Sequence, residues 1–238
     1  MVATSEGCPE NISYGLLYNW FAATDVRNIT SDDAWVVPTQ EQYTTLLNRI
    51  DTYNSSLGYW PNAQPKLKKI GTDWWIPNVG ITQTNETGFS GVGTGTRQNN
   101  GGFINFRANG SIWSSTSANT TDSKAILLSH TDNSSLLQNK PKKAGSPLRL
   151  MRTATAAEQL LADGTACDPY VQNDGKLIAT VKIGTQIWTA ANSVETKFRN
   201  GDYLHGYEGG SYQAISNANW AALISEGVCC YGDDINLI

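Results

Sequence analysis

The hydrophobic residues of this 238-residue chain recur at helical spacing in four short stretches. The clearest follows Thr39 and Gln42, which have the spacing of a capping box, and its apolar positions are Tyr43, Leu46, Leu47 and Ile50. This pattern predicts an amphipathic helix over residues 40–50. Similar spacing predicts helices over residues 14–21, 156–161 and 217–224, and the second of these has its own capping box at Thr155 and Glu158.

Shorter apolar runs separated by turn residues predict strands. Phe103–Phe106 and residues 112–115 flank Asn109-Gly110, while Leu177–Ile183 and residues 186–188 flank Gly184-Thr185. Because Asn and Gly readily take the positive φ angles of a tight turn, we expect two hairpins and a further turn at Asn200-Gly201. The glycine-rich run 91–95 lacks the lysine of a phosphate-binding loop and is predicted to be an ordinary loop.

Composition supports a folded chain with neutral polar surfaces. Hydrophobic residues make up 39%, with eight Trp and ten Tyr, which is enough to bury a core. Charged residues make up only 16% and the net charge is -4, so we expect no nucleic-acid partner. The basic stretch at Lys140, Lys142 and Lys143 is predicted to be a solvated loop. No apolar run is long enough to span a bilayer, and the first residues lack the features of a secretion signal, so we expect no membrane insertion.

Residues with catalytic or metal-binding chemistry are sparse. Cys8, Cys167, Cys229 and Cys230 have no zinc-type spacing and are interpreted as buried free thiols, although one of the adjacent pair should be exposed if they lie on a strand. The two histidines, His130 and His205, belong to no catalytic motif. The acidic pairs Asp32-Asp33 and Asp233-Asp234 are predicted to be solvated turns. We therefore expect no metal, no cofactor and no enzymatic activity.

Several motifs together resemble one family, the Fibrobacter succinogenes major paralogous domain of bacterial surface proteins and of phages. Its typical opening resembles Val181-Lys182-Ile183-Gly184-Thr185-Gln186-Ile187-Trp188-Thr189-Ala190-Ala191-Asn192, followed by Lys197-Phe198-Arg199-Asn200-Gly201-Asp202 and Asn219-Trp220-Ala221-Ala222-Leu223. Its later motifs resemble Tyr14-Gly15-Leu16-Leu17-Tyr18-Asn19-Trp20, Val37-Pro38-Thr39, Trp75-Ile76-Pro77-Asn78, Gly88-Phe89-Ser90, Ile112-Trp113-Ser114-Ser115-Thr116 and Leu148-Arg149-Leu150-Met151-Arg152. The resemblance implies an α+β fold similar to C-type lectins and formylglycine-generating enzymes, with two main helices flanking small antiparallel sheets.

The order of these motifs departs from the family. The opening motifs stand in residues 177–238 and the later ones in residues 13–153, with an N-terminal arm at 1–12 and a helical connector at 154–176. We interpret this as a circular permutation in which both segments complete one core. Two alternatives stay open: a domain swap between subunits, and a fragment of tandem repeats.

The resemblance also guides the functional expectation. Lectins of this fold hold calcium with a Glu-Pro-Asn or Gln-Pro-Asp triplet, but here Ile76 precedes Pro77-Asn78, so no calcium site is predicted. We expect a non-catalytic, oligomeric protein on a phage virion exterior that binds host-surface glycan or protein, or another virion protein. A bacterial surface or secreted adhesin fragment is the alternative, and a formylglycine-generating type of enzyme is a distant third. The candidate ligand-binding residues are loop aromatics and polar loop residues: Tyr59, Trp60, Trp74, Trp75, Arg97, Asn99, Asn100 and Arg107.

Overall fold

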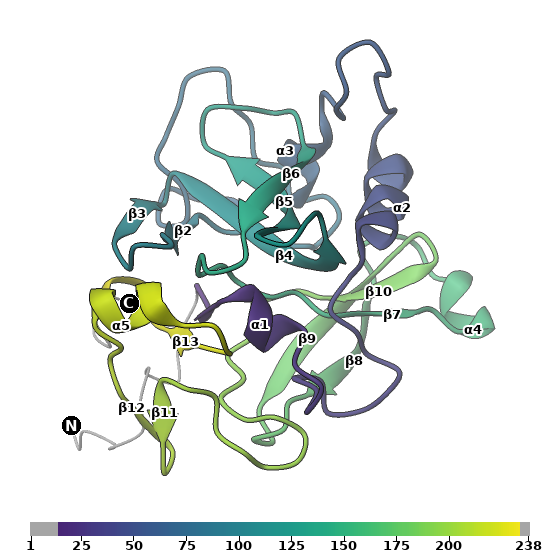
Figure 1. Ribbon diagram of the computed structural model, residues 1–238. Helices are drawn as coiled ribbons and strands as arrows, with labels where there is room; N and C mark the ends of the chain where they lie inside the picture. Colours follow the sequence, from purple (N-terminus) through teal and green to yellow (C-terminus); the bar gives the residue numbers. More distant parts are fainter. Residues whose placement is uncertain (1–13, 234–238) are drawn as a thin grey trace.

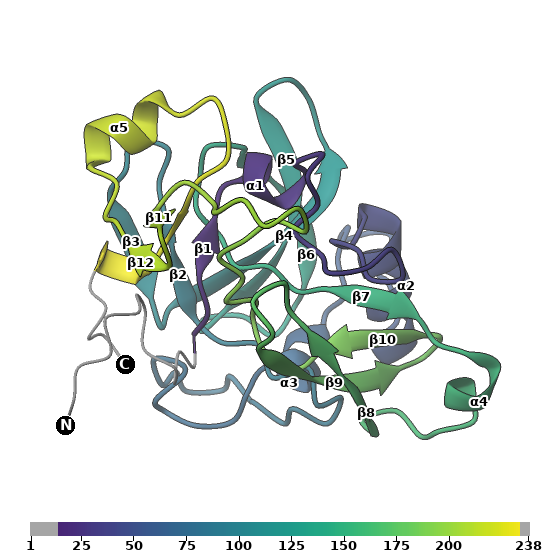
Figure 2. The same ribbon diagram turned by 90° about the horizontal axis from the view of Figure 1, so that it is seen from below.

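The computed structural model describes residues 14–233 as a mixed α+β arrangement in which short strands predominate and helices are few (Figure 1). Figures 1 and 2 show two main sheets that meet near the middle of the molecule. The predicted arm at 1–12, Cys8, Asp234 and the tail at 235–238 lie outside the described residues.

The larger sheet has five strands in the order β3-β2-β4-β5-β6. Their bounds are β2 Thr94–Arg97, β3 Phe103–Phe106, β4 Asn109–Ser117, β5 Asp122–Ser129 and β6 Leu136–Pro141. The predicted hairpin between β3 and β4 is wrong, because β2 lies between them and pairs antiparallel with β3 and parallel with β4. Gly110 is inside β4, and a Cβ there would lie 2.4 Å from the carbonyl oxygen of Val92. The glycine therefore permits a close approach of backbones and does not form a turn.

The second sheet has four strands in the order β7-β10-β9-β8. Their bounds are β7 Met151–Thr153, β8 Ala166–Val171, β9 Leu177–Ile183 and β10 Gln186–Thr189. The predicted hairpin of β9 and β10 is confirmed, with Gly184 at φ +60° in its turn. The turn at Asn200-Gly201 is confirmed as well, with Gly201 at φ +92°.

Two small sheets complete the strands: β1 (Leu17–Tyr18) with β13 (Val228–Cys229), and β11 (Tyr207–Glu208) with β12 (Ser211–Tyr212). The helix predicted over residues 14–21 is mostly wrong, because its centre is β1 and only a short helix, α1 (Trp20–Ala23), follows. Residues 16–19 are all buried, so this segment has no polar face that would distinguish a strand from a helix by periodicity. Asn19 ends the strand and caps α1 by accepting a hydrogen bond from the Ala22 amide.

The remaining helices are α2 (Gln40–Ile50), α3 (Ala63–Leu67), α4 (Ala156–Gln159) and α5 (Asn217–Ala222), followed by a 3-10 turn at Tyr231–Asp233. Both predicted capping boxes are present, at the starts of α2 and α4. The predictions for 40–50, 156–161 and 217–224 are thus confirmed to within two residues at each end. Among residues 14–233, every helix is too short or too polar to cross a membrane.

The two motif-bearing segments share sheets and core. Strand β10 pairs with β7, and β13 pairs with β1, so each segment supplies strands to the other. Ile112 and Met151 lie in the same buried cluster as Val181 and Trp188, which confirms the predicted contact between these segments. The permutation, the swap and the repeat-fragment interpretations stay predictions.

A buried arginine joins these segments. Arg149 follows β6 and is fully buried, and its guanidinium donates to the carbonyl oxygens of Phe89, Ser90 and Thr189 and to Oδ1 of Asn192 at 2.6–2.9 Å. Three of the sequence motifs therefore meet at one side chain. Burial lowers the pKa of Arg149 to about 9.

Other sequence predictions need correction. Lys140 and Lys142 are buried and Lys143 is half-buried, because their amines reach Thr96, Thr120 and Ala221 instead of solvent. The run 91–95 is only partly a loop, since β2 begins at Thr94.

The cysteine interpretation also changes. Cys167 is half-buried and free, Cys229 is buried and free, and Cys230 is buried and disulfide-bonded. Both members of the adjacent pair are therefore buried, so the prediction that one of them would be exposed is wrong.

Candidate functional site

The structure buries three of the predicted ligand-binding side chains. Trp75 is fully buried, and its indole donates to the Gly91 carbonyl oxygen at 3.2 Å. Trp60 is 5% exposed and donates to Oδ1 of Asn48 at 2.9 Å. Both rings belong to the core cluster around α2, so they offer no face to a ligand.

Arg97 is also fully buried, and its guanidinium contacts other residues of the chain. Its guanidinium lies between the rings of Phe103 and Trp220, at 4.8 and 4.4 Å from their centres. It donates to the Gly101 carbonyl oxygen at 3.0 Å and pairs with Asp233 at 3.2 Å. Asp233 is thus the partner of a buried arginine, and the prediction of a solvated acidic turn there is wrong. The other pair behaves as predicted: Asp32 and Asp33 are both exposed, and Asp32 caps a turn by accepting from the amides of Ala34 and Trp35.

The other predicted residues remain accessible, in different places. Asn99 and Asn100 are exposed in the turn between β2 and β3. Tyr59 is half-buried in the loop between α2 and α3, and its carbonyl oxygen accepts from the Asn54 amide at 3.0 Å. Trp74 and Arg107 are both half-buried. They lie near one another because the Trp74 ring packs on the Tyr14 ring, and the charge of Arg107 is close to the same tyrosine.

Trp74 is the first member of a continuous row of five partly exposed aromatic rings, which we call the aromatic row. Successive ring centres are 5.3, 4.9, 4.7 and 5.2 Å apart, and the order of the rings is Trp74, Tyr14, Phe106, Tyr231 and Phe103. Each of the five side chains is half-buried. The row follows the edge strand β3, which pairs with β2 on one side only. It combines rings from four separate parts of the chain.

Local backbone features place these rings. Gly95 in β2 has φ +68°, and a Cβ there would lie 2.4 Å from the Tyr231 ring, so only glycine lets this ring lie against the strand. Asn105 and Arg107 take φ +63° and +59°, which turn the chain at the end of β3 and direct Phe106 towards Tyr14 and Tyr231. The Tyr14 hydroxyl donates to the carbonyl oxygen of Asp73 and so anchors the ring beside Trp74.

Two cationic side chains lie at the Trp74 end of the row, while the ion pair of Arg97 and Asp233 lies at the Phe103 end. The Lys69 ammonium is 3.6 Å from the centre of the Trp74 ring, a cation–π geometry, and the Arg107 guanidinium donates to the Thr72 carbonyl oxygen. Burial raises the pKa of Tyr14 and of Tyr231 above the usual value, so both hydroxyls stay protonated at neutral pH. Rings with apolar faces and neutral hydroxyl edges can stack on a ligand and hydrogen-bond it at the same time.

Sequence reasoning missed four of the five rings. Phe103 and Phe106 were visible as the ends of a predicted strand, three positions apart, but an ordinary strand would place them on opposite faces. Tyr14 and Tyr231 lie near opposite ends of the chain, and only the folded structure brings them together.

Within the described residues, no three His, Cys, Asp or Glu side chains gather as a metal site would require. Ile76 and Asn78 are exposed in the loop that follows Trp75, and the Asn78 carbonyl oxygen accepts from the Ile81 amide at 3.3 Å, as in a turn.

The fold and the surface define a mixed α+β domain with several small sheets and an aromatic surface at one sheet edge. The chain belongs to the family described as the Fibrobacter succinogenes major domain, whose model matches residues 4–152. The match ends at β7, so the pairing strands β9, β10 and β13 lie beyond it. No curated protein matches the chain, and no solved structure matches it.

Proposed function

We propose that this chain is a non-catalytic, surface-displayed binding module whose aromatic row holds a glycan chain. The observation that carries the proposal is the continuity of five partly exposed rings along one sheet edge. The C–H faces of sugar rings are apolar, so they stack on aromatic faces, while sugar hydroxyls reach polar groups at the rim. A continuous row suits an extended saccharide better than a single sugar.

Polar groups beside the row support the same ligand class. Asn99 and Asn100 are exposed at the Phe103 end, and Asn105 is exposed in β3 itself. Amide side chains both donate and accept hydrogen bonds, as hydroxyl-rich ligands require. A protein ligand is the competing possibility, and Ile76 and Val79, exposed in the loop after Trp74, favour it.

The wider setting of this function is proposed from the motifs. The family motifs support a C-type-lectin-like fold in permuted order, with the residue 177–233 segment completing the core through β9, β10 and β13. We place the protein, as an oligomer, on the exterior of a phage virion, in a tail, fibre or capsid decoration. A bacterial surface or secreted adhesin is the alternative setting. Gene neighbours that encode capsid and tail proteins would favour the first, and neighbouring sulfatase genes would instead favour formylglycine-generating chemistry.

A glycan array probed with the intact protein and two variants tests the binding site. We expect the protein to bind a subset of extended glycans and Trp74→Ala to weaken this binding at least about tenfold, which corresponds to about 1.4 kcal/mol. Tyr59→Ala is the matched control, because Tyr59 is another half-buried loop aromatic that lies outside the row. Binding that survives Trp74→Ala, or that Tyr59→Ala reduces equally, would contradict the proposed site. If the protein binds only cell-surface protein and no glycan, the ligand of the aromatic row is a protein.

A further inference from the structure

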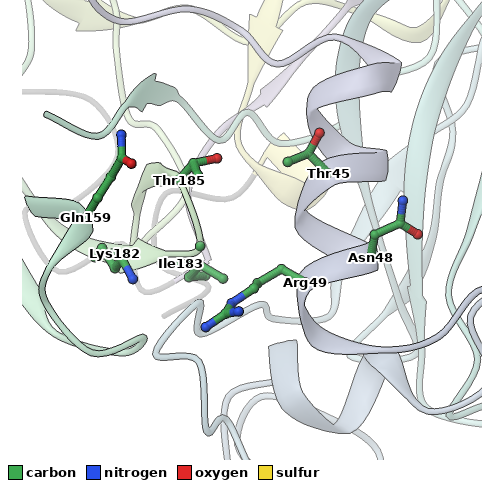
Figure 3. A pocket seen from close by; sticks show the side chains of 8 residues that line it. Thr45, Asn48, Arg49, Gln159, Lys182, Ile183 and Thr185 are labelled. Carbon is green, nitrogen blue, oxygen red and sulfur yellow. The ribbon is translucent and has the colours of Figure 1, made fainter. Parts of the chain in front are cut away.

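A concave site lies away from the aromatic row, between α2 and the β9–β10 hairpin (Figure 3). Its volume is about 400 Å³, within the range of small-ligand sites. Three elements line it: α2 with Thr45, Asn48 and Arg49, α4 with Gln159, and the hairpin with Lys182, Ile183, Gly184 and Thr185. Figure 1 shows β3 at one edge of the larger sheet and α2 far from that edge, so this cleft and the row are separate surfaces.

The hairpin turn fixes the position of Arg49. A Cβ at Gly184 would lie 3.1 Å from Cγ of Arg49, so the stem of the arginine lies directly on the glycine. Figure 3 shows Arg49 reaching from α2 across to the hairpin strand that carries Lys182. The guanidinium is held there by Nε, which donates to Oδ2 of Asp163 at 2.6 Å.

The charges at this site do not balance. Lys182 donates to Oδ1 of Asp163 at 2.8 Å, and its side chain is only 5% exposed. One carboxylate therefore faces two cations, and its oxygens are already occupied by Arg49, Lys182 and the Gly184 amide. These contacts keep the pKa of Asp163 below its usual value despite partial burial, so the carboxylate stays charged. A net charge of one positive unit remains at the cleft.

The uncompensated charge is accessible. The Arg49 side chain is 56% exposed, and its two terminal NH₂ groups have no hydrogen-bond partner among residues 14–233. The parallel donors of a guanidinium match the two oxygens of a carboxylate. The Thr185 hydroxyl points into the cleft and Gln159 lies beside it, which adds groups suited to sugar hydroxyls (Figure 3).

We propose that this cleft binds a carboxylate-bearing sugar unit, of the uronic-acid type, with the carboxylate on the Arg49 guanidinium and the hydroxyls on Thr185 and Gln159. The site would let the module distinguish acidic from neutral saccharides. Binding in this cleft does not require the aromatic row, so an experiment can disprove one of the two sites and leave the other supported.

The matched probes are methyl β-D-glucuronide and methyl β-D-glucoside, which differ only in a carboxylate against a hydroxymethyl group. Titration of the intact protein, followed by amide chemical shifts in NMR, should show shifts at Gly184 and neighbouring residues with the glucuronide. We expect the glucuronide to bind at least about tenfold more tightly than the glucoside, and this preference to shrink as salt concentration rises.

Variants at position 49 test the contact. Arg49→Gln should abolish the preference for the glucuronide, while Arg49→Lys, which keeps the charge but loses the fork of donors, should retain part of it. Trp74→Ala should leave the preference unchanged, which separates this site from the row. Equal affinity for both sugars, no shift near Gly184, or a preference that survives Arg49→Gln would overturn the proposal.

Discussion

The amine of Lys140 on β6 is buried without a countercharge, so its removal should stabilise the protein. Lys140 is 8% exposed, its Nζ donates to the Thr96 hydroxyl at 2.9 Å, and the Trp113 ring centre lies 5.9 Å away. It forms no ion pair with a carboxylate of residues 14–233. Burial lowers the pKa of Lys140 from 10.5 to about 7.

This difference in pKa sets the size and the pH range of the effect. Between pH 7 and 10.5 the unfolded chain binds a proton at Lys140 that the folded chain does not, so the free energy of unfolding rises with pH across this range. A pKa difference of one unit corresponds to about 1.36 kcal/mol, so the buried charge costs about 5 kcal/mol well below pH 7 and about 4 kcal/mol at pH 7. Lys140→Met removes that cost but leaves the Thr96 hydroxyl unpaired, at about 1–2 kcal/mol.

We therefore expect Lys140→Met to raise the free energy of unfolding by about 3 kcal/mol at pH 7, or the melting temperature by roughly 6–12 °C. The gain should shrink as the pH rises and be lost by pH 10.5, where half of the unfolded lysine is also neutral and the Thr96 hydroxyl of the variant is still unpaired. Thermal and urea unfolding of variant and wild type at pH 7, 8.5 and 10.5 measures this difference. Lys124→Met, on the neighbouring strand β5 and only half-buried, is the control and should change stability by less than about 0.5 kcal/mol. A Lys140→Met protein that is no more stable at pH 7, or whose gain is the same at pH 10.5, would refute the reasoning.

Three further predictions concern the core and the absence of a calcium triplet. Arg149→Met should lower the free energy of unfolding by about 3–5 kcal/mol in urea unfolding, because four buried acceptors lose their donor; an unchanged midpoint would contradict this. A fragment that ends at Gly164 lacks β9, β10 and β13 and should show no cooperative unfolding transition by circular dichroism; a well-folded monomeric fragment would sink the shared-core interpretation. EDTA should leave the melting temperature unchanged, because Ile76 occupies the position of a calcium ligand; a drop of several degrees would count against that.

The sequence predicted the elements whose signals are local. Capping boxes at Thr39 and Thr155 mark helix starts through contacts three residues apart, and Gly184 marks the β9–β10 turn through its own φ angle. The family motifs correctly predicted that the segment around Val181 packs against the segment around Met151.

Predictions failed where the environment of a residue is set by residues that are distant in the sequence. Gly110 resembled a turn residue, but a glycine is needed there because the Val92 backbone lies against it, which no local pattern reveals. Lys140 and Lys142 were predicted to be solvated because burying a lysine amine without a countercharge is costly. Both are buried in the structure. The aromatic row could not be predicted from local sequence, because Tyr14 and Tyr231 contact Phe106 only in the folded chain. Of its members, only Trp74 was predicted.

Mapping where a bound glycan contacts the protein tests the proposed binding surface most directly. Aromatic ¹³C resonances, followed by NMR as an array-selected glycan is added, report each ring separately. If the glycan binds the aromatic row, the shifts are confined to Tyr14, Trp74, Phe103, Phe106 and Tyr231, and Tyr59 and the buried Trp75 are unchanged. Shifts centred elsewhere on the surface, with the five rings unaffected, would contradict the proposed binding surface.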